Sequence, residues 1–388
     1  MSLFENGLSA SSLAFVVAVL SCLVLRRLAP VLGLMDRPGG RKRHAAPTPL
    51  VGGLALVAGL AVVWLMVPGA RPHPAWALAL GALVVLGVLD DRHPLSASLK
   101  FYIQAFVATG VVVLSDLALP HLGDLAPGWD PALLWLAVPF SVFAVLSVIN
   151  AINMVDGVDG LAGSLSLVAT GALAAAAFMV GAAPIGLGLL ALACALIGFL
   201  VFNAPLPGGR SARVFMGDAG SMGVGLLIAC YALELSHPAP SPAMPAVVAL
   251  WACAVPLADG LSVILRRRAR GAGATHPGRD HLHHWLLDRG LSTHRVLAVE
   301  VGASALIAAL GLALWRLGVP EWAMVWIFAG ALLSFHAWQK RCWGSVSRQG
   351  LDAEASASSS LGDPPSLPVP PLEPFARPSE SSGGLRGR

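Results

Sequence analysis

The chain has 388 residues, of which 56% are hydrophobic and 12% are charged, and its formal net charge is +4. Roughly a quarter of the residues in an average soluble domain are charged, so this composition excludes an ordinary soluble protein and indicates a polytopic membrane protein. The basic residues follow the predicted membrane topology instead of forming one patch, so we expect no nucleic-acid partner.

Long apolar segments recur along the chain as far as Trp338. A helix needs about 20 mostly apolar residues to cross a bilayer, so we predict an all-α fold with about eleven transmembrane helices. The predicted spans are residues 13–34, 50–67, 75–89, 99–114, 132–149, 161–180, 185–201, 220–235, 247–265, 297–315 and 323–338.

Lys and Arg residues gather in alternate gaps between these spans, whereas the opposite gaps hold little beyond Arg71 and Arg316. Cation-rich gaps lie on the cytoplasmic side of a membrane protein. We therefore predict a multi-pass protein with its N-terminus outside and its C-terminus inside.

The composition changes from about residue 342 onward to a sequence rich in Ser, Pro and Gly. Such a sequence buries too little apolar surface to offset the entropy of ordering it. We predict a membrane domain over residues 1–341 and a disordered cytoplasmic tail without a catalytic role over residues 342–388.

Five polar clusters interrupt the apolar sequence, and all five fall in gaps that we place on the cytoplasmic side. Chemistry on a lipid-borne substrate needs carboxylates, amides, imidazoles and cations at one membrane face, so these clusters predict cytoplasmic active-site loops. They are DRPGGRKRH (36–44), LDDRHPLSASLK (89–100), NAINMVDGVDG (150–160), RVFMGDAGS (213–221) and HPGRDHLHH (276–284).

The second cluster contains Asp90 and Asp91, followed by Lys100. Two carboxylates at a membrane boundary can bind a divalent cation, or one can accept a proton; the alternative is a pair of solvated helix-end acids. Lys100 shares a helix face with Gln104 near the start of a helix, where a phosphate is favoured, unless its ammonium snorkels to the lipid headgroups.

The third and fourth clusters carry amides and further acids. Burying the two Asn and two Asp residues of 150–160 at a bilayer edge is unfavourable without a ligand, metal or water, although a structural turn is an alternative. Asp218 between glycines can hold a metal or cap a helix, and Phe215 can stack on a base or anchor at the interface.

The fifth cluster places four histidines beside Arg279 and Asp280, behind the basic run RRRAR at 266–270. Its spacing is not that of a zinc protease, and no Cys accompanies it. Imidazoles beside Arg can donate charge-assisted hydrogen bonds to phosphate oxygens, and a surface loop without function is the alternative.

Together, in this order, the motifs resemble those of the polyprenyl-phosphate N-acetylhexosamine-1-phosphate transferase family (glycosyltransferase family 4), in its WecA/TagO-like branch. The resemblance extends from about Asp36 to about Arg295. It implies attack of undecaprenyl phosphate on the β-phosphorus of a UDP-N-acetylhexosamine, with release of UMP and a requirement for Mg²⁺ or Mn²⁺. It also implies a bacterial inner-membrane enzyme that initiates a cell-envelope polysaccharide.

The resemblance also assigns roles to residues. Asp218, with Asn153 as a second ligand, is similar to the metal-binding pair of the family. Asp90 and Asp91 resemble its essential acid pair, which either deprotonates the lipid phosphate or supports the metal site. The resemblance implies that pyrophosphate is neutralised by Lys100, His281, His283 and His284. It implies a substrate-binding group made of Asn150, Asp156, Asp159, Phe215, Arg266, Arg279 and His44.

The choice of donor substrate and one rival function remain open at this point. The HLHH sequence, in place of three adjacent histidines, favours UDP-N-acetylglucosamine over UDP-N-acetylmuramoyl-pentapeptide as donor. A secondary transporter is the rival, but it would be expected to place ionisable groups near mid-bilayer, and Asp259 is the exception among acids that otherwise cluster at helix ends. The oligomeric state is open, with a homodimer as one option.

Overall fold

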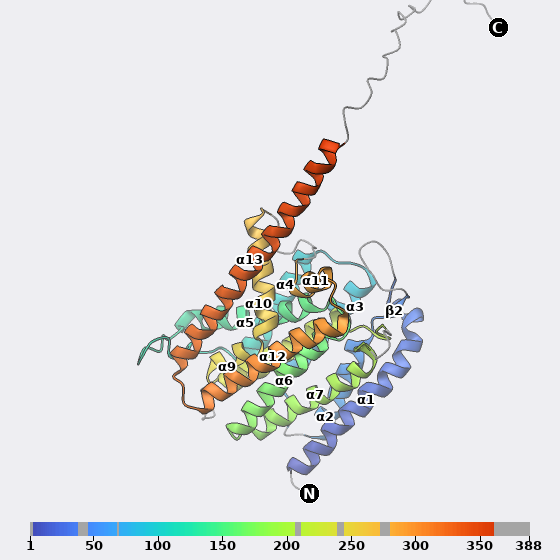
Figure 1. Cartoon of the computed structure of the whole chain (residues 1–388). Coiled ribbons are helices and arrows are strands. Elements are labelled where there is room, and N and C mark those ends of the chain that lie inside the picture. Colours follow the sequence, from blue (N-terminus) through green and yellow to red (C-terminus); the bar gives the residue numbers. More distant parts are fainter. Residues whose placement is uncertain are drawn as a thin grey trace, which may run out of the picture. The chain divides into compact units, whose positions relative to one another are not determined.

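The fold is described from a computed structural model (Figure 1). The structure describes residues 3–37, 46–67, 70–205, 211–238, 244–271 and 280–360. Within these ranges the helices are accompanied by loops and by one two-stranded antiparallel sheet, in which β1 (Met35–Asp36) pairs with β2 (Thr48–Pro49). The prediction of an all-α fold is confirmed.

The helices follow one another along the chain, and the longest described connection, residues 115–133, lies between α4 and η2. They are α1 (Leu3–Leu32), α2 (Gly52–Met66), α3 (Pro74–Arg92), α4 (Ala97–Leu114), the 3₁₀ helix η2 (Leu134–Leu136), α5 (Ala137–Val155), α6 (Leu161–Met179), α7 (Ala183–Asn203), α8 (Gly217–Ser236), α9 (Ala246–Ala252), α10 (Ala254–Ala269), α11 (Leu282–Asp288), α12 (Thr293–Arg316) and α13 (Glu321–Ser360).

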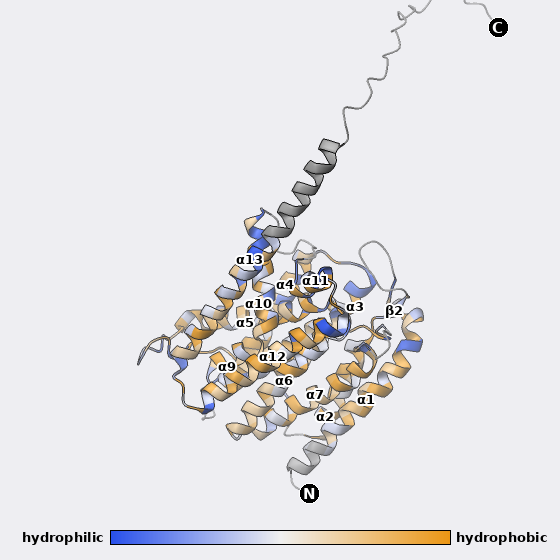
Figure 2. Ribbon diagram, viewed as in Figure 1, coloured by the Kyte–Doolittle hydropathy of each residue, from blue (hydrophilic) through white to orange (hydrophobic). Residues whose placement is uncertain are grey.

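Eight helices in the described part of the chain are long and apolar enough to cross a membrane, and α9 with α10 makes a ninth if that bent pair is one span. The chain is therefore a multi-pass membrane protein. The predicted count of eleven is not confirmed, since α2 has only 15 residues and α13 is not among the eight. Figure 2 shows mainly hydrophobic helices, with hydrophilic residues gathered near the ends of α3, α10 and α11.

The predicted span at 247–265 is broken in the structure. Its two parts, α9 and α10, meet at Cys253 with a bend of 80°. Pro256 explains the position of the break, because a proline clashes with the carbonyl of the residue four positions earlier, here Ala252, the last residue of α9. The bend turns α10 toward the polar loops.

The chain divides into two units, Met1–Trp338 and Gln339–Arg388. The structure continues α13 to Ser360, past the predicted domain boundary at residue 341. Residues 361–388 lie outside the described residues, so the boundary and the disordered tail stay predictions.

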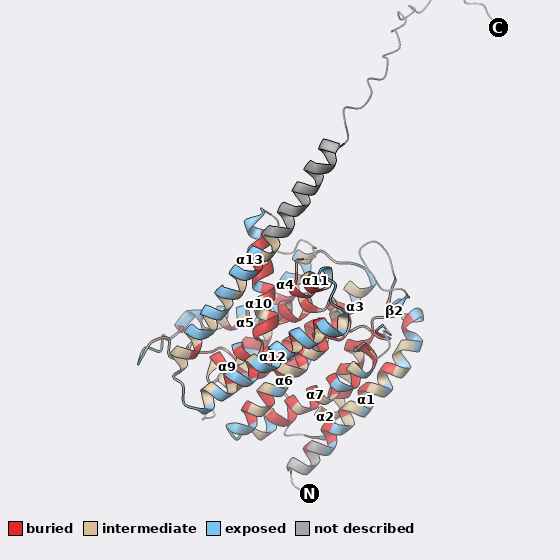
Figure 3. Cartoon of the chain, viewed as in Figure 1, coloured by how far each residue is buried: buried red, intermediate tan, exposed pale blue. Residues whose placement is uncertain are grey.

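Helix α8 is the central helix of the first unit, with 16 of its 20 residues buried. It packs against α2, α3 and α5, which carry the polar clusters or lead into them. Figure 3 shows buried residues on the inward faces of the helices and exposed residues along α1 and α12. Small residues make this central position possible, because they let neighbouring backbones approach closely.

Two glycines set the distance between α8 and the neighbouring helices α2 and α3. A Cβ atom added to Gly87 in α3 would lie 2.1 Å from the backbone nitrogen of Ala219, and one added to Gly53 in α2 would lie 2.3 Å from that of Gly220. Gly87 precedes Asp90 and Asp91 by about one helical turn. Backbone contact at Gly87 therefore brings the acid pair beside Asp218.

The strand-like segment before α8 is also fixed to the start of α2. The backbone N–H groups of Gly52 and Gly53 donate to the carbonyl oxygens of Phe215 and Met216, each at 2.9 Å, and the Phe215 N–H donates to Pro49 at 2.8 Å. These bonds fix the VFMGD segment (214–218) relative to the start of α2.

We predict that Gly87→Ala separates α3 from α8, because the added methyl group would meet backbone and not a movable side chain. Overpacking typically costs about 1–3 kcal/mol, which corresponds to a Tm lower by several degrees. Thermal unfolding in detergent measures this effect.

Gly81→Ala is the matched control, since a Cβ on Gly81 of the same helix meets nothing within 4 Å. It should leave Tm unchanged or raise it slightly, because alanine is favoured over glycine in a helix by about 1 kcal/mol. Equal effects of the two substitutions would contradict the close α3–α8 contact.

Candidate active site

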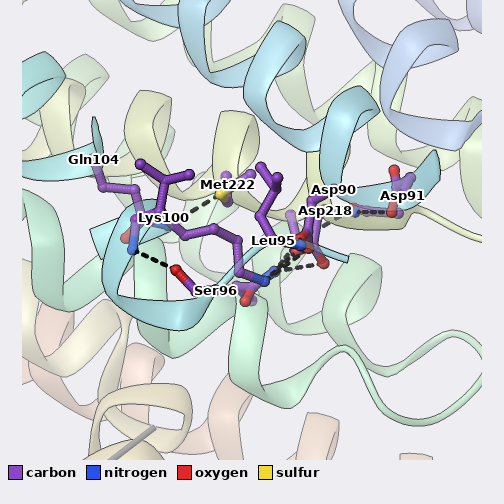
Figure 4. A network of polar contacts seen from close by, with 12 residues as sticks. Asp90, Asp91, Leu95, Ser96, Lys100, Gln104, Asp218 and Met222 are labelled. Carbon is purple, nitrogen blue, oxygen red and sulfur yellow. Dashed lines mark hydrogen bonds and ion pairs between the residues drawn. The ribbon is translucent and has the colours of Figure 1, made fainter. Parts of the chain in front are cut away.

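The side chain of Lys100 lies between two carboxylates that come from different helices (Figure 4). Its Nζ is 2.7 Å from Oδ2 of Asp90 at the end of α3 and 3.0 Å from Oδ2 of Asp218 at the start of α8. The three side chains are partly buried, with exposed fractions of 24%, 12% and 26% respectively. An ammonium in this position offsets the electrostatic repulsion between the two carboxylates.

Asp90 also fixes the turn that precedes Lys100. Its Oδ1 accepts a hydrogen bond from the backbone N–H of Leu95 at 2.7 Å, while Ser96 accepts one from the N–H of Leu99 at 3.2 Å and caps α4. Both oxygens of Asp90 are therefore engaged, one by the loop and one by the ammonium.

Asp91 contacts the start of α8 through one oxygen only. Its Oδ1 accepts a hydrogen bond from the backbone N–H of Asp218 at 3.0 Å, whereas its Oδ2 is buried and has no hydrogen-bond partner. Gly217 allows this contact: its φ is +71°, and a Cβ there would lie 2.5 Å from Asp91 Oδ2. A buried carboxylate oxygen without a donor is costly unless a cation or proton satisfies it.

Asn153 joins this network from the last turn of α5. Its Nδ2 donates to Oδ1 of Asp218 at 3.1 Å and to the hydroxyl of Ser221 at 2.9 Å. Asn153 and Asp218, the predicted metal-binding pair, are thus in direct contact, and their role as metal ligands stays a prediction.

Asn150, one turn earlier, faces α4. Its Nδ2 donates to Oε1 of Gln104 at 3.0 Å and to the carbonyl of Leu146 at 2.8 Å, and Gln104 Nε2 lies 3.0 Å from the sulfur of Met222. These bonds tie α4, α5 and α8 together directly behind Lys100.

Asp156 follows the end of α5 and adds a further carboxyl group near the network. Its burial, together with the charges of Asp218, Asp91 and Asp159, raises its pKa to about 7. Among the described residues of this network, the carboxyl groups of Asp90, Asp91, Asp156 and Asp218 therefore outnumber the one ammonium, that of Lys100, which pairs with Asp90 and Asp218.

The remaining acid of this loop has a structural contact. Asp159 Oδ2 accepts a hydrogen bond from the backbone N–H of Ala212 at 2.8 Å. Buried Asn203, at the end of α7, accepts from Gly160 N–H and donates to the Val214 carbonyl, both at 2.9 Å. These contacts join the DGVDG loop to the VFMGD segment.

The histidines form a second cluster around the start of α11. The His281 and His283 rings are stacked with centroids 5.3 Å apart, and the His283 and His284 rings meet edge to face at 4.3 Å. A Cβ added to Gly157 would lie 2.8 Å from His283 Nε2, so this cluster adjoins the DGVDG loop. The structure thus brings the third and fifth polar clusters together.

Arginines at the end of α10 bind Asp280, the residue directly before the histidines at the start of α11. Buried Arg266 donates to the Ser262 hydroxyl and the Asp280 carbonyl, and Arg267 and Arg270 pair with the Asp280 carboxylate at 3.3 and 3.0 Å. Burial opposes ionisation of Asp280, but hydrogen bonds from Arg270 and Arg267 outweigh it and lower its pKa. Arg266 thus links α10 to Asp280, and its predicted role in substrate binding stays a prediction.

Of three other predicted substrate-binding residues, the structure describes one. Phe215 is half-buried, and its backbone forms a parallel bridge with Leu50. His44 and Arg279 lie outside the described residues, so their predicted roles stay predictions.

Sequence reasoning missed the contacts of two buried residues. Asp259 in α10 bonds to His281 at 2.7 Å, and Asn203 links two loops. A polar residue inside or at the end of an apolar span is the signal that marks both positions.

The chain resembles known proteins over most of its length. The family model for glycosyl transferase family 4 matches residues 73–236, which include the Lys100 network. Proteins from Escherichia coli O157:H7 and Yersinia pestis are each 35% identical over 331 residues, covering 85% of this chain and 90% of each relative. A protein from Haemophilus influenzae is 35% identical over 338 residues, which cover 85% of this chain and 94% of the relative.

The chain belongs to glycosyl transferase family 4. The three relatives are each named undecaprenyl-phosphate alpha-N-acetylglucosaminyl 1-phosphate transferase. The resemblance inferred from the five motifs is confirmed by this family membership, which favours an enzyme over the rival transporter.

We predict that the raised pKa of Asp156 makes stability pH-dependent in buffer without divalent cation or substrate. The folded state binds this proton more tightly than the unfolded state, in which the carboxyl titrates near its model value of 3.8. Its stabilising contribution is complete below that value and is lost as pH rises through about 7. Tm should therefore fall between pH 5 and pH 8.

The Tm of Asp156→Asn, relative to that of the wild type, should rise from pH 5 to pH 8. Asp116→Asn is the control, because Asp116 is exposed with a φ of +53°, a conformation that asparagine tolerates. An unchanged slope of Tm against pH in Asp156→Asn would exclude the proposed origin of the pH dependence.

Proposed function

We propose that the chain transfers N-acetylglucosamine 1-phosphate from UDP-N-acetylglucosamine to undecaprenyl phosphate, giving undecaprenyl diphosphate-N-acetylglucosamine and UMP. The observation that carries the proposal is the Lys100 ammonium bound by Asp90 and Asp218 from separate helices. The names of the relatives support the choice of both substrates. The reaction would initiate a cell-envelope polysaccharide.

The physical demand of this reaction is to bring two phosphate groups together against their repulsion. Phosphoryl transfer depends mainly on positioning and on neutralisation of charge. A site at helix ends that combines an ammonium, histidines and a surplus of carboxylates able to bind a divalent cation meets this demand.

We propose Mg²⁺ as the cofactor, with Mn²⁺ as an alternative ion, held by Asp218 and Asn153. The residues fit such an ion, since the buried Asp91 Oδ2 has no partner and lies close to the start of α8. The described residues contain no group of three or more His, Cys, Asp or Glu side chains that could hold a metal. Mg²⁺ commonly binds one or two carboxylates and takes its other ligands from phosphate and water.

Asn153 can provide an oxygen ligand by rotating its amide. Amide oxygen and nitrogen positions are assigned from hydrogen bonds, and rotation of the group would turn Oδ1 toward Asp218 in place of Nδ2. When bound, the ion supplies neutralisation of pyrophosphate charge.

Lys100 would donate to a phosphate oxygen from its place between the two carboxylates. Asp90 then acts by holding the ammonium and the turn at Leu95, because both of its oxygens already accept hydrogen bonds. A lipid phosphate has a second pKa of about 6 and is mostly ionised near neutral pH. Deprotonation by Asp90 is therefore not required.

The histidines of the second cluster would donate hydrogen bonds to the pyrophosphate of the nucleotide. His281, His283 and His284 lie together beside the DGVDG loop, which carries Asp156. Imidazolium donors to phosphate give short, charge-assisted hydrogen bonds. In this proposal the nucleotide lies between the loop and α11.

We propose the bacterial inner membrane as the location, with the active site at its cytoplasmic side, the N-terminus outside and the C-terminus inside. The distribution of Lys and Arg over alternate gaps supports this orientation. UDP-sugars are cytoplasmic, which agrees with loops that face the same side.

The direct test is release of UMP from UDP-N-acetylglucosamine by the purified protein with undecaprenyl phosphate. Release should require both substrates and Mg²⁺. Asp218→Asn should lower kcat by roughly 10²–10³-fold or more, since a central charge of the site is lost. Asp116→Asn should retain wild-type activity, and full activity of Asp218→Asn would remove Asp218 from the mechanism.

The donor is tested by comparing UDP-N-acetylglucosamine with UDP-N-acetylmuramoyl-pentapeptide in the same assay. We expect turnover with the first donor and little with the second, because the relatives are named for N-acetylglucosaminyl transfer. Exclusive use of the pentapeptide donor would refute this choice of substrate.

A further inference from the structure

Asp259 is a buried acid in α10 that the proposed mechanism does not use. It is 1% exposed and lies about three turns before the end of α10, in the apolar part of the helix that precedes its arginines. A carboxylate in this position is costly without strong partners. Its partners are therefore informative about its role.

Both oxygens of Asp259 bind the start of the histidine motif. Oδ2 lies 2.7 Å from Nδ1 of His281, and Oδ1 accepts a hydrogen bond from the backbone N–H of Leu282 at 3.0 Å. Leu282 is the first residue of α11, whose initial N–H groups have no partner within the helix. One carboxylate thus binds an imidazole and fixes the start of the helix that carries the next two histidines.

The contact with His281 determines which ring nitrogen carries a proton. An ionised carboxylate only accepts hydrogen bonds, so Nδ1 of His281 is the donor to Asp259. Nε2 is then free of this contact, and it donates to an anion when the ring is an imidazolium, in which both nitrogens carry a proton. The His281 ring stacks on His283 with an interplanar angle of 7°, and His283 meets His284 edge to face. The orientation set by Asp259 therefore extends through the whole cluster.

We propose that Asp259 is a positioning residue that binds Nδ1–H of His281 and fixes α11. His281 then turns Nε2 toward the diphosphate of the nucleotide, to which it donates as an imidazolium. The proposal rests on the proposed function for the identity of the ligand. Asp259 itself touches no substrate in this arrangement. Carboxylates that orient a functional histidine act in this way at metal and catalytic sites.

Other charged and titratable groups also surround the pair. Arg266 follows Asp259 by two turns in α10, and Ser262 between them lies 2.8 Å from Nδ1 of His336 in α13. Glu300 in α12 is 2% exposed, and its Oε1 has no hydrogen-bond partner. Glu300 is a buried acid on a neighbouring helix whose charge interacts with that of Asp259. Among the described residues it makes no hydrogen bond to the histidine motif, and so it provides a matched control.

A double-mutant cycle tests the proposal kinetically. Asp259→Asn should lower kcat about 10–100-fold, the usual effect of removing an orienting partner, with little change in KM for undecaprenyl phosphate. In a His281→Gln background the same substitution should change kcat less than about twofold, because residues that act as one unit are not additive. Glu300→Gln should leave kcat near wild type.

Additive losses from Asp259→Asn and His281→Gln would overturn the proposal, as would an equal loss from Glu300→Gln. Additivity would show that Asp259 acts independently of His281. An equal loss would show that any buried acid at this depth is needed only for folding. Tm of each variant is measured in parallel, so that a misfolded protein is recognised.

Nitrogen NMR of ¹⁵N-histidine-labelled wild-type protein tests the same contact without turnover. The resonances that disappear in His281→Gln should show a protonated Nδ1, and Asp259→Asn should shift them. A wild-type His281 protonated only at Nε2 would refute the proposal. This readout needs no substrate, so it remains decisive if the protein transfers a different sugar or none, which separates its failure from that of the proposed function.

Discussion

The structure depends on the balance of charge at the ends of α3, α4, α5 and α8. Lys100 is bound by Asp90 at 2.7 Å and by Asp218 at 3.0 Å. Asp91 and Asp156 add two more carboxyl groups, and the described part of the network contains no second ammonium. Gathering carboxylates in a partly buried site is unfavourable unless cations join them. A divalent ion would therefore stabilise the site. The same ion could neutralise the charge of two reacting phosphates, which links this structure to the proposed reaction.

Helix packing makes this gathering of charge possible. Gly53 and Gly87 allow backbone contact of α2 and α3 with α8, and Gly217 leaves room for the Asp91 carboxylate. Small residues at these positions give close contacts that do not depend on flexible side chains. The bend after Ala252 directs α10 toward the loops, where its arginines and Asp259 hold the histidine motif. Acid pair, ammonium and histidines are thus positioned by rigid helices and not by loops alone.

Much of the site could be predicted because its residues are polar exceptions in an apolar sequence. Asp90, Lys100, Asn153 and Asp218 stand out for this reason, and the structure joins them in one hydrogen-bonded network. Partners could not be predicted, because spacing along a sequence does not specify which helix lies opposite. Pro256 marks the break in the predicted span 247–265, but a prediction from hydropathy alone does not take account of a proline.

The central claim is that the carboxylates around Lys100 form an electrostatic site for a divalent cation. Binding of Mg²⁺ to the purified protein at constant ionic strength tests it most directly, through Tm and titration calorimetry without substrates. We predict that Mg²⁺ raises the wild-type Tm, and that Asp91→Asn raises Tm in the absence of Mg²⁺ while weakening the response to the ion. A wild-type protein that is indifferent to Mg²⁺, or an Asp91→Asn variant that binds it as tightly as wild type, would contradict the account.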